Sequence, residues 1–177
     1  MRPWQIDPSH SSVEFAVRHL MISTVKGRFG EVSGQVVAEQ NDPAKIQVDV
    51  RIPVASIDTR EPQRDAHLRS PDFLEADRYP TITFVSRRLS GDPKSGFKLI
   101  GDLTIRGVTK ATTLDVTNEG VGLDPWGNER AGFSATAKVD RRDFGLTWNQ
   151  ALETGGILVG DEVKISLNVE LMRPKAA

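Results

Sequence analysis

The chain has 177 residues, with 23 Lys or Arg against 24 Asp or Glu and no cysteine. A domain of this length buries about two-thirds of its unfolded surface, so we expect one domain over residues 1–177 that folds without a disulfide or a metal. The balanced charge does not favour nucleic acid, whose binders carry a basic excess or stripe. The missing cysteine excludes disulfides, thiolate nucleophiles and cysteine-based metal sites.

The N-terminal residues predict no export signal, because no apolar run of about 7–15 residues follows Met1–Asp7. No stretch approaches the ~20 apolar residues of a membrane helix. We therefore expect a cytoplasmic protein without stable membrane insertion, or a periplasmic one if a signal has been removed.

Apolar and polar residues alternate along several runs, of which the first contains Val13, Phe15 and Val17. This alternation is typical of antiparallel strands with one dry face. Because closure removes exposed edges, long strands of this kind favour an all-β antiparallel barrel. Eight strands are predicted, at about residues 11–19, 23–38, 45–55, 80–89, 96–106, 111–122, 130–141 and 161–172.

One segment, residues 59–79, is predicted to be helical and lies between the third and fourth strands. We expect two short helices, the second starting at Ser70–Pro71, where a capping residue precedes a proline at the first helical position. The segment also carries Leu68, Phe73 and Leu74, which need an apolar surface to dock on. We therefore expect it to cap or line one mouth of the barrel.

No catalytic or metal site is assigned. His10, His19 and His67 lack the spacing of paired metal ligands. Residues 23–26 match the Ser-x-x-Lys string of some hydrolases, but in a strand this spacing puts the two side chains on opposite faces. The glycine-rich residues 155–160 are not followed by a helix, so they do not predict a phosphate loop. We expect no catalysis, no metal and no cofactor.

The inward faces carry few polar groups, and a barrel of this size is filled by side chains or holds one small ligand. The small inward row from Ala131 to Ala137 favours a cavity. His19, Arg141 and Asp161 end inward rows and are predicted to bind a head group at the rim. Arg141 is the best candidate for an anion, because guanidinium binds two oxygens at once.

Seven blocks of the sequence, in order along the chain, carry a resemblance to a known family; they span residues 4–19, 23–29, 65–74, 79–84, 101–110, 142–148 and 159–163. Together these blocks resemble the YceI-like family of bacterial polyisoprenoid-binding proteins. The resemblance implies an eight-stranded lipocalin-like barrel and a ligand such as a polyisoprenoid, an isoprenoid quinone or a fatty-acid derivative. It also implies no catalysis. Many family members are exported to the periplasm, and we expect this chain to depart from them, because no export signal is predicted.

The sequence thus predicts binding, storage or transport of a long apolar ligand. His67 is also predicted to lie at the rim and bind the head group, together with His19, Arg141 and Asp161. The predicted apolar lining is Phe15, Val17, Phe84, Phe133, Ala135, Ala137, Phe144, Leu146, Trp148 and Ile165. Two alternatives stay open: an enzyme acting on a prenyl or acyl substrate with His19 or His67 as acid–base, and a stress-related barrel with a packed interior. A homodimer is also open.

Overall fold

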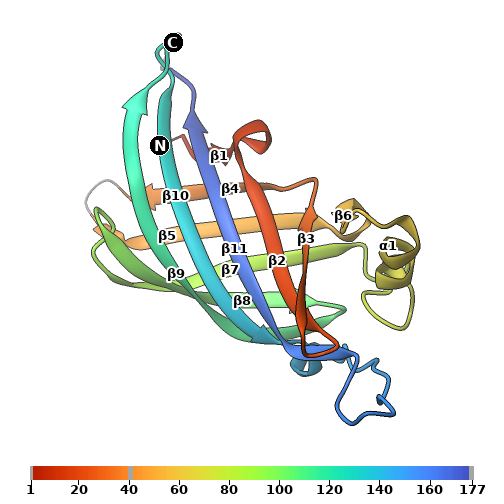
Figure 1. The fold of residues 1–177 in the computed structure, drawn as a ribbon. Helices are drawn as coiled ribbons and strands as arrows, with labels where there is room; N and C mark the ends of the chain where they lie inside the picture. The colour runs from red at the N-terminus through yellow and green to blue at the C-terminus, as the bar shows by residue number, and fades with distance from the viewer. Residues whose placement is uncertain (1, 40–41, 176–177) are drawn as a thin grey trace.

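The computed structural model describes residues 2–39 and 42–175, so residues 1, 40–41 and 176–177 of the predicted domain lie outside its description. Most of the described chain is β-strand (Figure 1). The strands are β1 (Trp4–Ile6), β2 (Ser12–His19), β3 (Ser23–Phe29), β4 (Ser33–Glu39), β5 (Asp42–Pro53), β6 (Ile57–Asp58), β7 (Thr81–Gly91), β8 (Gly96–Ile105), β9 (Val108–Leu123), β10 (Glu129–Asp140) and β11 (Val159–Arg173). The helices are α1 (Pro62–Arg69) and the 3-10 turns η1 (Pro8–His10), η2 (Val54–Ser56) and η3 (Arg141–Phe144).

Eight of the described strands form a closed antiparallel ring in the order β1-β4-β5-β7-β8-β9-β10-β11. Pairing of β1 with β11 closes the ring, with Gln5 opposite Met172. The other half of β11 pairs with β2, which continues the sheet into β3 and β6. The predicted eight-stranded antiparallel barrel is therefore confirmed.

The alternation found in the sequence decides which side chains face inward. In the β10–β11 pair, Ala135 lies opposite Leu167 and Ala137 opposite Ile165. Ala135 and Ala137 are buried, whereas Thr136 between them is exposed. Each long strand therefore has one dry face and one wet face, as the period of two requires.

The single strand predicted over residues 23–38 is wrong, because the structure has β3 and β4 separated by three residues. At this break the amide of Gly30 leaves the ladder and donates to the carbonyl of Ser56 (2.8 Å), and Val32 turns into the core. The break allows β3 to pair with β2 and β6 while β4 pairs with β1 and β5. The short strands β1 and β6 were not predicted.

The second predicted helix is also wrong, since residues 70–74 form turns. Ser70 does not start a helix but ends α1, because both its amide (3.1 Å) and its hydroxyl (2.6 Å) donate to the carbonyl of His67. The start of α1 follows the usual chemistry. Pro62 stands in its first turn, and the Glu61 side chain accepts from the amide of Arg64.

A two-residue turn joins β8 to β9 and fixes the position of the helical segment. Arg106 and Gly107 both have positive φ (50° and 71°), as a type I′ hairpin turn requires. The Arg106 guanidinium donates to the carbonyls of Pro71 and Gly145, both at 2.9 Å. This arginine therefore ties the hairpin to the turns after α1 and to the end of η3.

Across residues 2–39 and 42–175, no helix has both the length and the apolar character needed to cross a bilayer.

Candidate functional site

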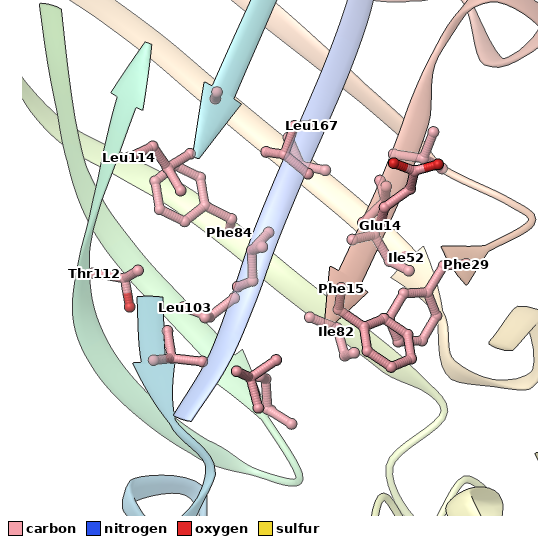
Figure 2. Close-up of a pocket in the computed structure, with 18 of the residues that line it drawn as sticks. Glu14, Phe15, Phe29, Ile52, Ile82, Phe84, Leu103, Thr112, Leu114 and Leu167 are labelled. Carbon is pink, nitrogen blue, oxygen red and sulfur yellow. The ribbon is translucent and has the colours of Figure 1, made fainter. Parts of the chain in front are cut away.

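The barrel encloses a cavity of about 500 Å³ whose walls are almost entirely apolar (Figure 2). This volume lies within the ~300–1,000 Å³ typical of small-molecule sites. The alternative of a packed interior does not hold, because the inward side chains leave this space open. Nine of the predicted lining residues border the cavity: Phe15, Val17, Phe84, Phe133, Ala135, Phe144, Leu146, Trp148 and Ile165. Ala137 was also predicted to line it; it is buried on the same inward row but does not border the cavity.

Glycines position two of the aromatic rings in the wall. The ring of Phe15 covers Gly27 on the neighbouring strand, where an added Cβ would collide with it. The ring of Phe84 covers Gly101 in the same way. Phe15 also lies against Phe29, with ring centroids 5.6 Å apart (Figure 2). The width of the cavity at these points therefore depends on glycine.

Most of the polar side chains that border the cavity come from the end of β2, from the region of helix α1 and from η3, and the others are Glu14 on β2 and Thr112 on β9 (Figure 2). In this region His19 at the end of β2 pairs with Val159 at the start of β11. The ring of His67 packs edge-on against the ring of Trp148, with centroids 4.7 Å apart, and His67 Nε2 lies 2.8 Å from Asp72 Oδ2. His19 and His67 both border the cavity, as predicted for the rim. We call this region the polar mouth.

The helical segment lines this end of the cavity, as expected. It contributes Leu68, Phe73 and Leu74 to the wall. Phe73 packs on His67 at a centroid distance of 5.0 Å and on Trp148 at 5.4 Å. The three rings therefore join α1 to the segment that follows η3.

Arg141 borders the cavity as predicted, but it is only 4% exposed and its donors are occupied. Burial lowers the pKa of its guanidinium. Four hydrogen bonds of 2.7–3.3 Å run to main-chain oxygens, which belong to Leu146, Trp148, Val159 and Gly160. This bonding fastens the segment after η3 to the start of β11. It contradicts the interpretation of Arg141 as a guanidinium free to bind an anion.

Asp161 does not border the cavity, so its predicted place on the inward row is wrong. A register irregularity in the β2–β11 pairing between Val159 and Val163 breaks the alternation at this point. The carboxylate lies 3.7 Å from Arg141 and 3.5 Å from Arg142. Asp161 thus faces the basic residues of η3.

Arg64 and Thr59 form a part of the polar mouth that was not predicted. Arg64 Nε donates to Thr59 Oγ1 (2.8 Å), and Arg64 Nη2 donates to the Thr59 carbonyl (2.7 Å). Both residues border the cavity. The signal in the sequence was the i, i+3 spacing of Arg64 and His67, which places both on one face of a helix.

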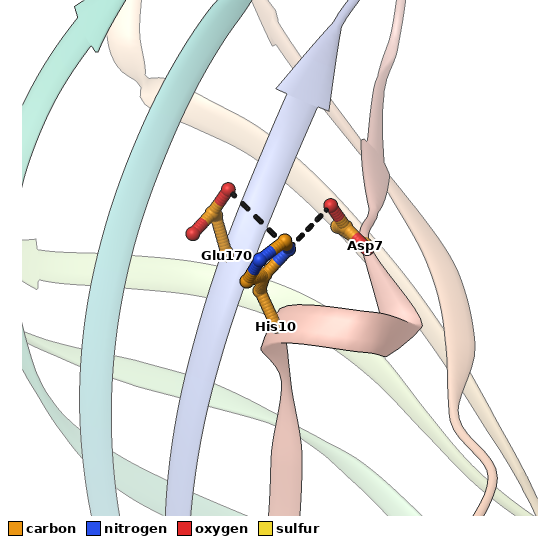
Figure 3. A group of neighbouring side chains, drawn as sticks. All are labelled: Asp7, His10 and Glu170. Carbon is orange, nitrogen blue, oxygen red and sulfur yellow. Dashed lines mark hydrogen bonds and ion pairs between the residues drawn. The ribbon is translucent and has the colours of Figure 1, made fainter. Parts of the chain in front are cut away.

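A second cluster of ionisable residues lies where η1 meets β10 and β11, and Figure 3 shows three of its members, Asp7, His10 and Glu170. His10 Nδ1 lies 3.0 Å from Asp7 Oδ2 and 4.0 Å from Glu170 Oε1. Arg130 Nη1 donates to both carboxylates, at 2.5 Å and 2.9 Å. A guanidinium thus already bridges the two carboxylates, and the cluster ties η1 to β10 and β11.

Hydrogen bonds shift the pKa values in this cluster. Bonds from Ser9, His10 and Arg130 hold the pKa of the Asp7 carboxyl well below its usual range. The hydrogen bond to Asp7, with the nearby charge of Glu170, raises the pKa of His10. The charged forms of both residues are therefore favoured in the fold.

A closed antiparallel barrel around an apolar cavity with one polar mouth is the architecture of a small-molecule-binding protein. Residues 4–171 match the family model of the YceI-like domain, so the chain belongs to the YceI-like family. The UPF0312 protein SAS2572 of Staphylococcus aureus (strain MSSA476) is 39% identical over 171 residues, which cover 96% of this chain and 97% of that protein.

Solved structures share the fold. The YCEI protein of Campylobacter jejuni is 33% identical with a TM-score of 0.75, covering 89% of this chain and 90% of that one. Burkholderia cenocepacia BcnA is 24% identical with a TM-score of 0.78, covering 93% and 98%. A polyisoprenoid binding domain from Saccharophagus degradans, implicated in plant cell wall breakdown, has a TM-score of 0.68 at 14% identity, covering 97% and 98%. At these identities the last two show the fold alone.

Proposed function

We propose that the protein binds one long apolar molecule inside the barrel and stores or transports it without chemical change. The candidate ligands are a polyisoprenoid, an isoprenoid quinone and a fatty-acid derivative. The observation that carries the proposal is the apolar cavity of about 500 Å³, enclosed by the whole ring of strands. The polyisoprenoid-binding domain with the same fold supports the first of these ligands.

Simple energetics agree with such a ligand. Burying ~15 methylene-sized groups at ~0.8 kcal/mol each gives a gross gain of order 12 kcal/mol. Association and the freezing of a flexible chain offset much of this. The remainder suffices for useful affinity even when the head group adds little, so the hydrocarbon chain of the ligand sets most of the affinity.

Catalysis by His19 or His67 is the competing proposal. His67 is engaged with Asp72 and with two aromatic rings, and within the described residues no serine or threonine hydroxyl lies in hydrogen-bond reach of either imidazole. This geometry supports binding over acid–base chemistry. The cytoplasmic location, the homodimer and the lack of a cofactor stay predictions.

Extraction of the purified protein with organic solvent, followed by mass spectrometry, tests the proposal. We expect one lipid per chain, and uptake of a fluorescent lipid after that lipid is removed. A protein that yields no lipid and takes up no fluorescent lipid would refute the binding function. Turnover of an added prenyl or acyl ester would instead establish the enzyme.

A further inference from the structure

We infer that α1 carries a head-group site in which Arg64 binds the anionic head, phosphate or carboxylate, of an otherwise apolar ligand. The inference rests on the proposed function, because the cavity must hold the apolar chain. It adds a chemical class to that function: amphiphiles with one anionic group next to a long hydrocarbon chain.

Arg64 is held in place by a short series of hydrogen bonds that begins in the protein interior. The buried carboxylate of Asp65 accepts from the amide (2.8 Å) and the hydroxyl (2.5 Å) of Thr59. Thr59 is itself only 4% exposed, and it accepts from Nε and Nη2 of Arg64. The guanidinium is therefore oriented before any ligand arrives, which lowers the cost of ordering it on binding.

The remaining donors of Arg64 are available to a ligand. Its Nη1 group donates to no residue of the described chain, and no described carboxylate lies within ion-pair distance of its guanidinium. The nearby acidic groups are engaged elsewhere. Asp65 accepts from Thr59, Asp72 faces His67, and Glu61 accepts from the backbone of α1.

The other arginines that border the cavity do not offer the same chemistry. Arg141 is saturated by main-chain oxygens. Arg18 lies at an outward-facing position of β2, and its guanidinium donates to Thr24 Oγ1 (3.2 Å) and to the carbonyl of Met21 (3.0 Å). Arg64 is thus the guanidinium at the polar mouth that combines a fixed orientation with free donors.

His67 completes the site. It follows Arg64 by three residues, so both side chains lie on one face of α1, and both border the cavity. Its Nε2 is engaged with Asp72, which leaves Nδ1 without a partner in the described part of the chain. A fork-shaped guanidinium with a second nitrogen beside it matches an oxyanion with two or three oxygens.

The test compares head groups on one hydrocarbon chain. Delipidated protein loaded with a fluorescent lipid is titrated with geranylgeranyl phosphate, geranylgeraniol, palmitate and hexadecanol. We expect the wild type to prefer each anion over its alcohol by about tenfold, and Arg64→Gln to reduce both ratios to near one. Arg64→Lys, which keeps the charge but loses the fork, should retain part of the preference.

Arg69→Gln is the matched control. Arg69 is in the same helix, does not border the cavity and has no side-chain partner among the described residues, so its removal should leave both ratios unchanged. Thermal unfolding of each variant verifies that it is folded. A preference that survives Arg64→Gln, or a wild type that binds anion and alcohol equally, overturns the site while leaving the barrel a lipid binder. Failure of the wild type to bind any of the four ligands overturns the proposed function itself.

Discussion

Replacing Ala135 by Trp should block the cavity without unfolding the barrel. Ala135 lies between Val116 and Leu167 on the neighbouring strands, and all three border the cavity. An indole adds about nine heavy atoms at this point, and each methylene-sized group that it displaces is worth ~0.8 kcal/mol to a bound chain. Displacing only four such groups removes ~3 kcal/mol, or more than a hundredfold in affinity.

The same substitution should cost little stability. Overpacking a filled core costs ~1–3 kcal/mol, but the indole of Ala135→Trp enters open space. Ala137→Trp is the matched control, because Ala137 is two residues further along the same buried row and does not border the cavity. We expect Ala137→Trp to lower the free energy of unfolding by ~1–3 kcal/mol and Ala135→Trp by less than ~1 kcal/mol.

Chemical denaturation measures the free energy of unfolding of each variant, and titration with a fluorescent lipid measures its affinity for the ligand. The reasoning is refuted if Ala135→Trp takes up lipid with wild-type affinity, since the ring would then not stand in the binding space. It is also refuted if both variants are destabilised equally, because the cavity would then be no more open at Ala135 than at Ala137.

Three further predictions follow from the geometry. Gly27→Ala should push the Phe15 ring into the cavity and weaken binding of the longest of a series of fatty acids by about four- to fifteenfold, the value of one or two methylenes, in a competition assay. Because the pKa of His10 is raised in the folded state, its bond to Asp7 stabilises the fold fully at pH values below the unfolded pKa of about 6.5. This stabilisation is lost as the pH rises through the higher pKa of the folded state. The free energy of unfolding of wild type minus that of His10→Asn should therefore be larger at pH 6 than at pH 9. Arg141→Gln should lower the free energy of unfolding by ~3 kcal/mol, because it leaves carbonyls unsatisfied, and should weaken prenyl phosphate and prenyl alcohol alike.

Each of these has an outcome that would contradict it. Equal loss for short and long fatty acids would show that the Phe15 ring does not limit chain length. A pH-independent difference for His10→Asn would remove that histidine from the stabilising network. A selective loss of prenyl phosphate in Arg141→Gln would return Arg141 to the head-group role. Arg142→Gln serves as its control, since Arg142 is exposed and its ion pairs are worth ~0–1 kcal/mol.

Period-two alternation predicted most of the barrel, because a strand with one buried face alternates apolar and polar residues, and this pattern is visible in consecutive residues of the sequence. β10 and β11 show this, with long apolar rows that match the observed register. The break at Gly30 has no such signal, because it depends on a carbonyl from η2 about 25 residues away in the chain. The end of α1 at Ser70 was misread for a related reason: the same hydroxyl chemistry serves both to start and to end helices.

The lining of the cavity was predictable from parity, but the roles of the polar residues were not. Parity placed Arg141 on an inward row, yet its function is set by carbonyls that a tertiary fold brings together. Arg64 stood in a segment already predicted to be helical. Only the structure shows that Thr59 orients it and that its Nη1 group has no partner among the described residues. For a charged side chain, the number of satisfied donors therefore separates a structural role from a binding role, and the sequence does not report it.

The distribution of polar groups also predicts a direction for the proposed ligand. Arg64, His67 and His19 border the cavity at the end nearest α1, which lies to the right in Figure 1. At the far end, toward the turn between β7 and β8, the wall is formed by apolar side chains that include Ile46 and Phe97. A charged head would lose its solvation at that end without gaining a partner, which costs far more than burying hydrocarbon there gains. For the proposed amphiphile, we therefore expect the tail to lie toward the β7–β8 end and the charged head toward α1, so that the β7–β8 end limits the length of the bound hydrocarbon chain.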